Sequence, residues 1–181
     1  MRIIGVDIDD VVLETAKAIL KELGLLHKYD ECTTYDITDL GVSVDAVMEA
    51  LHRVLSHTQD IPIVNGAVEA LNRIEFDRIA FISQRYEMYR NVTLKTLTDF
   101  NFRLPWDLYF SKHDGNKMKH EIINDLGIEL MIEDNPNTLA EIWDNTRASL
   151  VVFDRPWNQA IRGARIRRIY NWGELVGGSV R

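Results

Sequence analysis

Short runs of apolar, often β-branched residues recur along the chain, and they alternate with stretches in which apolar side chains return every three or four positions. An uninterrupted apolar run is typical of a strand buried on both faces of a sheet, whereas the longer spacing is typical of a helix. The predicted strands are residues 2–6, 77–83, 107–110, 129–133 and 149–153. Strands that alternate with helices predict a parallel sheet with helices on both faces.

The stretches between the predicted strands carry helix signals. Residues 66–75 and 86–100 have apolar side chains at helical spacing, and residues 117–127 end on a glycine. The segment "NPNTLAEIWDN" opens with a proline near its first turn. Glycine just past a helix and proline just inside it are end signals with a steric basis, so we expect a helix in each of these stretches.

Residues 14–65, called the cap segment below, interrupt this alternation. They contain no convincing strand but two helical patterns, "ETAKAILKELGLL" and "SVDAVMEALHRVLSH". The second pattern has one apolar face, formed by Val44, Val47, Met48, Leu51 and Leu55. Because this connection is longer than an ordinary loop, we expect a small helical cap inserted after the first strand. Residues 1–13 and 66–181 then form a Rossmann-like core.

Composition and charge exclude several classes of protein. An apolar fraction of 46% is that of a globular chain, and the net charge of −7 argues against nucleic acid or anionic membrane as a partner. The basic stretch "RGARIRRIY" is too short to change this. No apolar run approaches the roughly 18 residues of a membrane span, and the chain turns acidic by residue 7, unlike a signal peptide. With one cysteine, Cys32, no internal disulfide can form. We therefore expect a soluble, cytoplasmic protein.

Polar side chains follow the predicted strands where each strand ends. Asp7, Asp9 and Asp10 follow the first strand, Ser83, Gln84 and Arg85 the second, and Glu133 and Asp134 the fourth, while Lys117 and Lys119 open the helix before that strand. In open α/β sheets ligands bind beyond the carboxyl ends of the strands, and neighbouring strands lie about 5 Å apart. These groups are therefore expected to converge.

The converging groups suit phosphoryl chemistry with a metal ion. Clustered carboxylates are oxygen ligands of the kind that Mg²⁺ prefers. A hydroxyl and an ammonium group can hold phosphoryl oxygens, one carboxylate can act as a nucleophile, and another as an acid and then a base. Each group alone has a plain alternative, such as a solvated turn, a strand-end hydroxyl, a surface lysine or a helix signal. Their joint occurrence in this order favours a site.

These same stretches resemble the motifs of the haloacid dehalogenase (HAD) superfamily. "DIDDVV" resembles its first motif, Asp-x-Asp-x-Thr/Val, "FISQR" its second, and "KHEIINDLGIELMIED" its third and fourth together. The resemblance spans residues 2 to about 173 and is nearest to the cytosolic 5′(3′)-deoxyribonucleotidases and their bacterial and phage relatives, which "VVFDRPWN" and "RIYNWGEL" also resemble. It implies a three-layer core around a central parallel sheet, with a small helical cap.

The resemblance also implies roles for single residues. Asp7 would be the nucleophile that forms an aspartyl-phosphate, with one oxygen on Mg²⁺. Asp9 would protonate the leaving alkoxide and then activate water, with its backbone carbonyl touching the metal. Ser83 would hold a phosphoryl oxygen. Lys119, with Lys117 as the alternative, would neutralise charge between the phosphate and Asp7.

Further residues complete the implied site. Asp134 would bind the metal directly and Glu133 through water. Gln84 and Arg85 are candidate substrate contacts, although Arg85 could instead pair with a carboxylate. Two positions depart from the family pattern: Asp10 stands where glycine is common, and Glu133 where aspartate is usual.

Aromatic and histidine side chains near the implied site have two interpretations. Those of the cap segment could contact a base or serve packing: His27, Tyr29, Tyr35, His52 and His57. Trp157, in "RPWN", is expected to pack.

Three functions follow from this pattern. The first is a Mg²⁺-dependent phosphomonoesterase that acts on a small phosphate ester, foremost a 5′-nucleotidase of (deoxy)ribonucleoside monophosphates. The second is the same chemistry on a sugar phosphate or a polynucleotide end, the latter disfavoured by the low basic charge. The third is a non-catalytic phosphate- or nucleotide-binding module, against which the presence of Asp9 speaks. The resemblance leaves the oligomeric state open and admits a homodimer.

Overall fold

The structure, a computed structural model, describes residues 1–111 and 117–177 and is built around one parallel sheet. The strand order is β3-β2-β1-β4-β5-β6, and every neighbouring pair is parallel. The strands are β1 (Ile3–Val6), β2 (Arg78–Ser83), β3 (Trp106–Phe110), β4 (Leu130–Glu133), β5 (Ser149–Phe153) and β6 (Ile166–Ile169). The five predicted strands are confirmed, each within one residue of its expected bounds.

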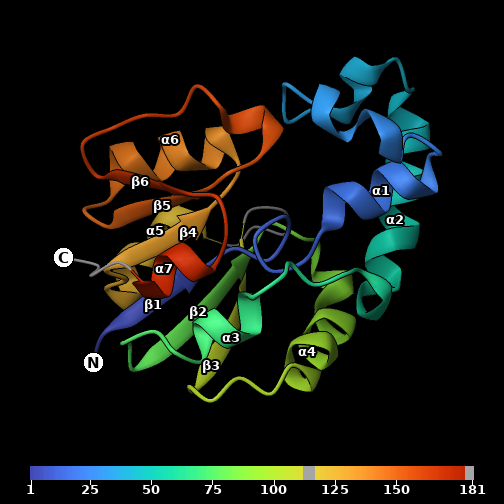
Figure 1. Ribbon diagram of the computed structural model, residues 1–181. Coiled ribbons are helices and arrows are strands. Elements are labelled where there is room, and N and C mark those ends of the chain that lie inside the picture. Colours follow the sequence, from blue (N-terminus) through green and yellow to red (C-terminus); the bar gives the residue numbers. More distant parts are fainter. Residues whose placement is uncertain (112–116, 178–181) are drawn as a thin grey trace.

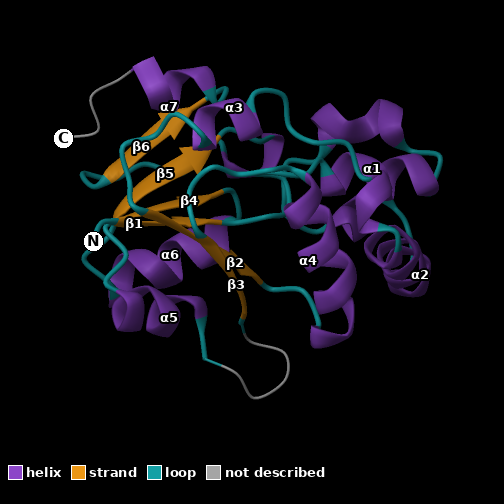
Figure 2. Ribbon diagram, turned by 90° about the horizontal axis from the view of Figure 1, so that it is seen from below, coloured by secondary structure: helices purple, strands orange, loops and turns teal. Residues whose placement is uncertain are grey.

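Helices cover both faces of the sheet. Figure 2 shows α3 (Ala67–Leu71) and α7 (Gly173–Gly177) above the sheet and α5 (Lys119–Leu126) and α6 (Pro136–Asn145) below it. The sheet divides the hydrophobic core in two: Ile4 and Val6 face one cluster, which also holds Leu97 of α4 (Arg90–Asp99), while Ile3 faces the other. This is the expected three-layer α/β architecture around a central parallel sheet.

The ends of two helices confirm the sequence signals. Gly127 follows α5 with a left-handed φ of 63°, which glycine adopts without the steric penalty of a Cβ atom. Asn135 caps α6 by accepting hydrogen bonds from the backbone of Asn137 and Thr138, and Pro136 stands in the first turn. Two other predictions were too long: α3 ends at Leu71, and the stretch 86–100 begins with a 3₁₀ turn before α4.

Strand β6 was not predicted. It lies at the edge of the sheet beside β5, with Arg167 opposite Val151 and Arg168 opposite Val152. Charged side chains are common on edge strands because they oppose pairing with another chain. The same arginines hid the strand in the sequence, where they look like a basic stretch instead of a buried apolar run.

The cap segment is helical in the structure and lies beyond the carboxyl ends of the strands (Figure 1). It contains α1 (Thr15–Glu22), α2 (Val44–Ser56) and three 3₁₀ turns, Leu26–Glu31, Ile37–Leu40 and Thr58–Asp60. Its two ends run side by side: Leu13 bridges to Ile63, and the N–H of Glu14 donates to the carbonyl of Pro62 at 2.8 Å. Such paired ends, here residues 13–14 and 62–63, are typical of an inserted module. The division of the chain at residues 14 and 65 stays a prediction.

Across residues 1–111 and 117–177, no helix combines the length and the apolar character needed to cross a membrane.

Candidate active site

The carboxyl ends of β1, β2 and β4 bring the predicted side chains to one edge of the sheet. In the register of these strands, Val6 lies opposite Phe81 on one side and Ile132 on the other. The N–H of Asp7 continues the ladder by donating to the carbonyl of Ile132 at 2.9 Å. Asp7 and Glu133 therefore leave adjacent strands at the same level, as the sequence predicted.

Three carboxylates form a compact acid cluster there. Asp7, Glu133 and Asp134 are all buried, and each has an oxygen within 4.8 Å of the others. The ammonium group of Lys119, whose side chain is only 1% exposed, lies 2.7 Å from Asp7 Oδ1 and 2.7 Å from Glu133 Oε2. Lys117, the alternative considered above, pairs with Asp125 on the surface instead.

The acid cluster is short of positive charge. Burial raises the pKa of Asp7 well above its usual range, and Glu133 adds to this, although Lys119 acts in the opposite direction. Burial and the neighbouring Glu133 likewise raise the pKa of Asp134. Burial alone would lower the pKa of Lys119, but the two carboxylates beside it raise the value above its usual range. Among the described residues, Lys119 is the one ammonium group that pairs with the cluster, and it reaches two of the three acids. A further cation would therefore favour the ionised forms of the carboxylates.

The carboxylate oxygens fit a divalent cation. Asp134 Oδ2 accepts a hydrogen bond from the indole nitrogen of Trp157 at 2.9 Å, but Oδ1 is buried and has no hydrogen-bond partner among the described residues. A buried, orphaned carboxylate oxygen beside other acids indicates a missing ligand, and oxygen donors of this kind suit Mg²⁺. Asp7 and Asp134 could hold the ion directly.

Glu133 is used differently from the other two acids. Its Oε2 accepts from Lys119, and its Oε1 accepts from the backbone N–H groups of Asp134 (3.1 Å) and Asn135 (3.0 Å). Both oxygens therefore have protein donors. Glu133 thereby holds the loop that carries Asp134, and its role towards a metal through water stays a prediction.

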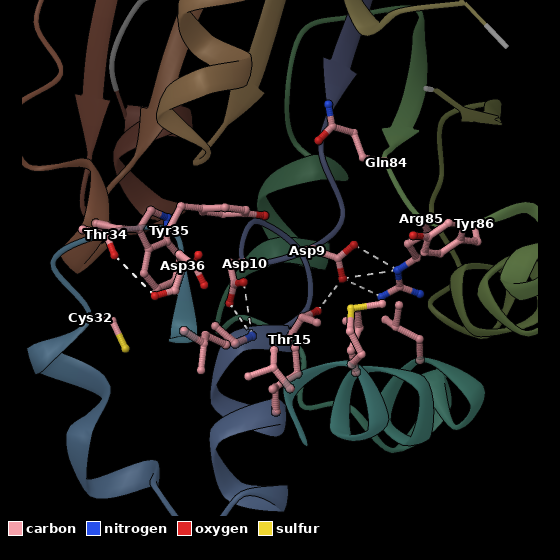
Figure 3. Close-up of a pocket in the computed structure, with 18 residues that line it drawn as sticks. Asp9, Asp10, Thr15, Cys32, Thr34, Tyr35, Asp36, Gln84, Arg85 and Tyr86 are labelled. Carbon is pink, nitrogen blue, oxygen red and sulfur yellow. Dashed lines mark hydrogen bonds and ion pairs between the residues drawn. The ribbon is translucent and has the colours of Figure 1, made fainter. Parts of the chain in front are cut away.

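Asp9 stands apart from the acid cluster. Its carboxylate accepts hydrogen bonds from Arg85, at 2.7 Å to Oδ1 and 3.0 Å to Oδ2, and from the hydroxyl of Thr15 at 2.5 Å, as Figure 3 shows. Burial would raise the pKa of Asp9, but Arg85 and Thr15 outweigh burial and lower it. Of the two interpretations of Arg85, the structure shows the ion pair with a carboxylate.

Ser83 and Gln84 directly precede Arg85 in the chain, at the end of β2. Ser83 ends β2 and is fully buried, and its hydroxyl oxygen accepts a hydrogen bond from the N–H of Arg85 at 3.1 Å. Gln84 lines the cavity described below. The structure therefore places Ser83 at the strand end and Gln84 on the cavity wall.

Asp10 has a structural task. Its φ of 58° lies in the left-handed region, which glycine adopts freely and aspartate tolerates. Its carboxylate accepts from the N–H of Ala16 at 3.0 Å, in the first turn of α1, and so acts as the cap that Glu14 does not provide. Burial raises the pKa of Asp10 to about 7, although Arg155 opposes this.

A cavity of about 340 Å³ opens between the cap segment and the ends of the strands (Figure 3). Its apolar wall comes from α1 and α2 and consists of Ile19, Val47, Met48, Leu51 and Leu55. Tyr35, Tyr86 and Trp157 add aromatic surface, and Asp9, Gln84 and Arg85 lie on the side of the core. The apolar face predicted for the second cap helix thus faces this cavity in part instead of being fully buried.

Three residues near the site were missed or assigned only to packing. Thr15 contacts Asp9, Trp157 contacts Asp134, and the amide of Asn158 donates to the backbone carbonyl of Asp134 at 2.9 Å. The similarity of "VVFDRPWN" to the resembled group was the one signal that pointed to the last two. Their contacts join segments far apart in the chain, which periodicity cannot detect.

Comparison with known proteins identifies the fold. No protein-family model matches the chain, and no curated protein matches it in sequence. A haloacid dehalogenase-like family hydrolase from Xanthomonas campestris superposes with a TM-score of 0.60 at 11% identity, over 98% of this chain and 93% of that one. A Thermotoga maritima protein assigned as a β-phosphoglucomutase gives a TM-score of 0.59 at 14% identity, over 98% and 97%.

A third structure was solved with magnesium. It is YfnB of Bacillus subtilis, assigned as a HAD hydrolase, with a TM-score of 0.56 at 14% identity over 97% of each chain. At such identities the likeness concerns the fold. The chain has the three-layer α/β fold with a six-stranded parallel sheet that HAD-type hydrolases share.

Proposed function

We propose that the protein is a Mg²⁺-dependent phosphomonoesterase, and specifically a 5′-nucleotidase of (deoxy)ribonucleoside monophosphates. The observation that carries the proposal is the buried acid cluster with Lys119 and an Asp134 oxygen that has no hydrogen-bond partner among the described residues. Bound Mg²⁺ would add positive charge to this cluster. It would also reduce the electrostatic repulsion between the phosphate and the attacking carboxylate. The fold of the compared hydrolases and the magnesium in YfnB support the hydrolase and Mg²⁺ parts of this proposal.

The chemistry follows from the two separated aspartates. A carboxylate oxygen of Asp7 attacks phosphorus, the bond from phosphorus to the ester oxygen breaks, and the leaving alkoxide takes a proton from Asp9. Asp9 can give this proton only in a state in which its ion pair with Arg85 has opened and its carboxylate has taken up a proton. Water then attacks the phosphoryl group on Asp7 while Asp9 takes its proton, which releases phosphate and restores Asp7. Lys119 holds Asp7 in place and offsets the charge that builds up between the carboxylate and the phosphate.

The cavity supports a nucleoside as the leaving group. A volume of about 340 Å³ falls within the range of small-molecule sites, and the wall is largely apolar with two tyrosines. Arg85, the one arginine among the described residues that line the cavity, is paired with Asp9. A polynucleotide end needs further cations for its other phosphates. A sugar needs many hydrogen-bond partners for its hydroxyls. A flat, uncharged base suits this wall better than either.

The test is phosphate release from a panel of esters. The panel holds 5′- and 3′-(deoxy)nucleoside monophosphates, sugar phosphates and p-nitrophenyl phosphate, each with Mg²⁺ and with EDTA. Mg²⁺-dependent release that favours 5′-nucleotides would support the proposal. Release from sugar phosphates alone would make a sugar phosphate the substrate instead of a nucleotide. No phosphate release by folded, Mg²⁺-loaded protein would favour a non-catalytic binding module.

The matched control for this panel is Asp7→Asn. It keeps the size of the side chain and removes the nucleophile, so we expect the fold to persist and turnover to vanish. Substantial remaining phosphatase activity would refute the assignment of Asp7.

A further inference from the structure

One aromatic residue of the core contacts both the acid cluster and the cap segment. Trp157 lies in the 3₁₀ turn Pro156–Asn158 that follows β5, and it is buried. Its indole N–H donates to Asp134 Oδ2 at 2.9 Å, and the second oxygen of that carboxylate is the orphaned one. The tryptophan therefore occupies one of the two oxygens and leaves the other open.

The indole nitrogen of Trp157 can only donate in this contact. An indole nitrogen donates a single hydrogen bond and accepts none, so it cannot act as a ligand or exchange roles with a cation. Asn158 secures the same loop by donating from its amide to the backbone carbonyls of Asp134 and Phe153, each at 2.9 Å. With the backbone and one oxygen both held, the direction of the free Oδ1 is fixed.

The ring of Trp157 packs against the cap segment. Tyr29 and Tyr35 each meet its ring edge to face, with ring centroids 5.9 Å away and planes at 79°. Trp157 also shares a hydrophobic cluster with Leu20 and Cys32, both buried residues of the cap segment. The ring that positions Asp134 is thus packed inside the cap's own core.

We propose that Trp157 is a positioning residue for the cation site and couples it to the cap segment. Its N–H donates to Asp134 Oδ2, so that Oδ1 points to the cation. The position of its ring against Tyr29 and Tyr35 sets the length and angle of that hydrogen bond. Cation affinity then depends on how the cap segment is seated. This inference rests on the cation site of the proposed function.

The first test separates the hydrogen bond from the packing. Trp157→Phe keeps an aromatic ring against Tyr29 and Tyr35 and removes the N–H. Outer partners of metal ligands commonly contribute tenfold or more to metal affinity, so we expect the Kd for Mg²⁺, measured by titration calorimetry without substrate, to rise roughly tenfold. Trp143→Phe is the matched control, because Trp143 lies on α6 and stacks with Arg165. Wild-type Mg²⁺ affinity in Trp157→Phe would overturn the proposal.

The second test addresses the cap segment and does not depend on the first variant folding. Tyr35 is 45% exposed, so Tyr35→Leu is expected to fold. It removes one edge contact to Trp157, and we expect a Kd for Mg²⁺ about threefold above wild type, in line with a partial loss of the outer-shell contribution. An unchanged Kd in this variant would overturn the coupling to the cap segment. A wild-type chain that binds no Mg²⁺ would instead refute the cation site of the proposed function.

Discussion

Arg85 donates hydrogen bonds to both carboxylate oxygens of Asp9, from Nη2 to Oδ1 and from Nε to Oδ2. Its side chain is 1% exposed, and its remaining nitrogen donates to the hydroxyls of Thr58 at 3.0 Å and Thr93 at 2.8 Å. Thr58 follows α2 and donates in turn to the carbonyl of Leu55. One guanidinium group therefore joins the loop after β1, the last part of the cap segment and α4.

We expect Arg85→Met to destabilise the protein by about 3 kcal/mol, because it leaves a largely buried carboxylate and two hydroxyls without their donor. Urea unfolding measures the loss. Arg90→Met is the control, since Arg90 pairs with Glu87 near the surface and should matter little. Adding Asp9→Asn to Arg85→Met should recover part of the loss, because the unpaired charge is then gone. Strictly additive losses would show that the two side chains do not act together.

Asp9→Asn should discriminate between leaving groups. We expect kcat/KM for a nucleoside monophosphate to fall at least about tenfold further than kcat/KM for p-nitrophenyl phosphate, because an alkoxide needs a proton to leave and a nitrophenolate does not. In the proposed mechanism both values report the step that forms the phosphoryl-enzyme, so the comparison isolates the acid role. Equal losses on the two substrates would mean that Asp9 acts through the metal or through structure.

Lys119→Met should unfold the metal-free protein more easily, by about 3–5 kcal/mol, because Asp7 and Glu133 then lose the cation that lies 2.7 Å from each. Urea unfolding in EDTA tests this. Lys117→Met, which removes a surface pair with Asp125, should leave the midpoint nearly unchanged. If the two variants unfold alike, Lys119 is not the lysine that stabilises the acid cluster.

Mg²⁺ should stabilise the protein more strongly as pH rises. Burial raises the pKa of Asp7 and of Asp134, so the folded metal-free chain binds more protons than the unfolded chain. Its stability therefore falls as pH rises from the unfolded towards the folded pKa. The cation needs both carboxylates ionised, so its affinity grows over the same range. Thermal unfolding with EDTA and with Mg²⁺ between about pH 5 and pH 8 measures the difference, and a gain in Tm that is independent of pH would contradict it.

The sequence predicted most of the sheet and the place of the acids because both are local signals. Buried strands are continuous apolar runs, and Asp7, Ser83 and Glu133 directly follow or end such runs. Since parallel strands end at one edge, strand positions alone indicated that these residues converge.

What the sequence could not predict depends on contacts between distant segments. The partner of Arg85 is decided by three segments that meet only in the fold. The N–H of Trp157 reaches Asp134 only because the turn after β5 packs beside the loop after β4. Strand β6 was hidden because two arginines in "IRRI" interrupt its apolar pattern.

The pairing of Leu13 with Ile63, at the two ends of the cap segment, affects how the chain folds as it is synthesised. β1 is made before both strands that flank it, and its first partner, β2, follows only after the whole cap segment. Closing a long loop costs entropy, and contacts between distant residues slow folding. Once Leu13 meets Ile63, the cap segment no longer counts towards that loop, and only the short stretch containing α3 separates β1 from β2. A cap segment that forms first would therefore bring β1, the strand that precedes Asp7, close to β2. The part of the chain that covers the cavity would then also help to assemble the sheet.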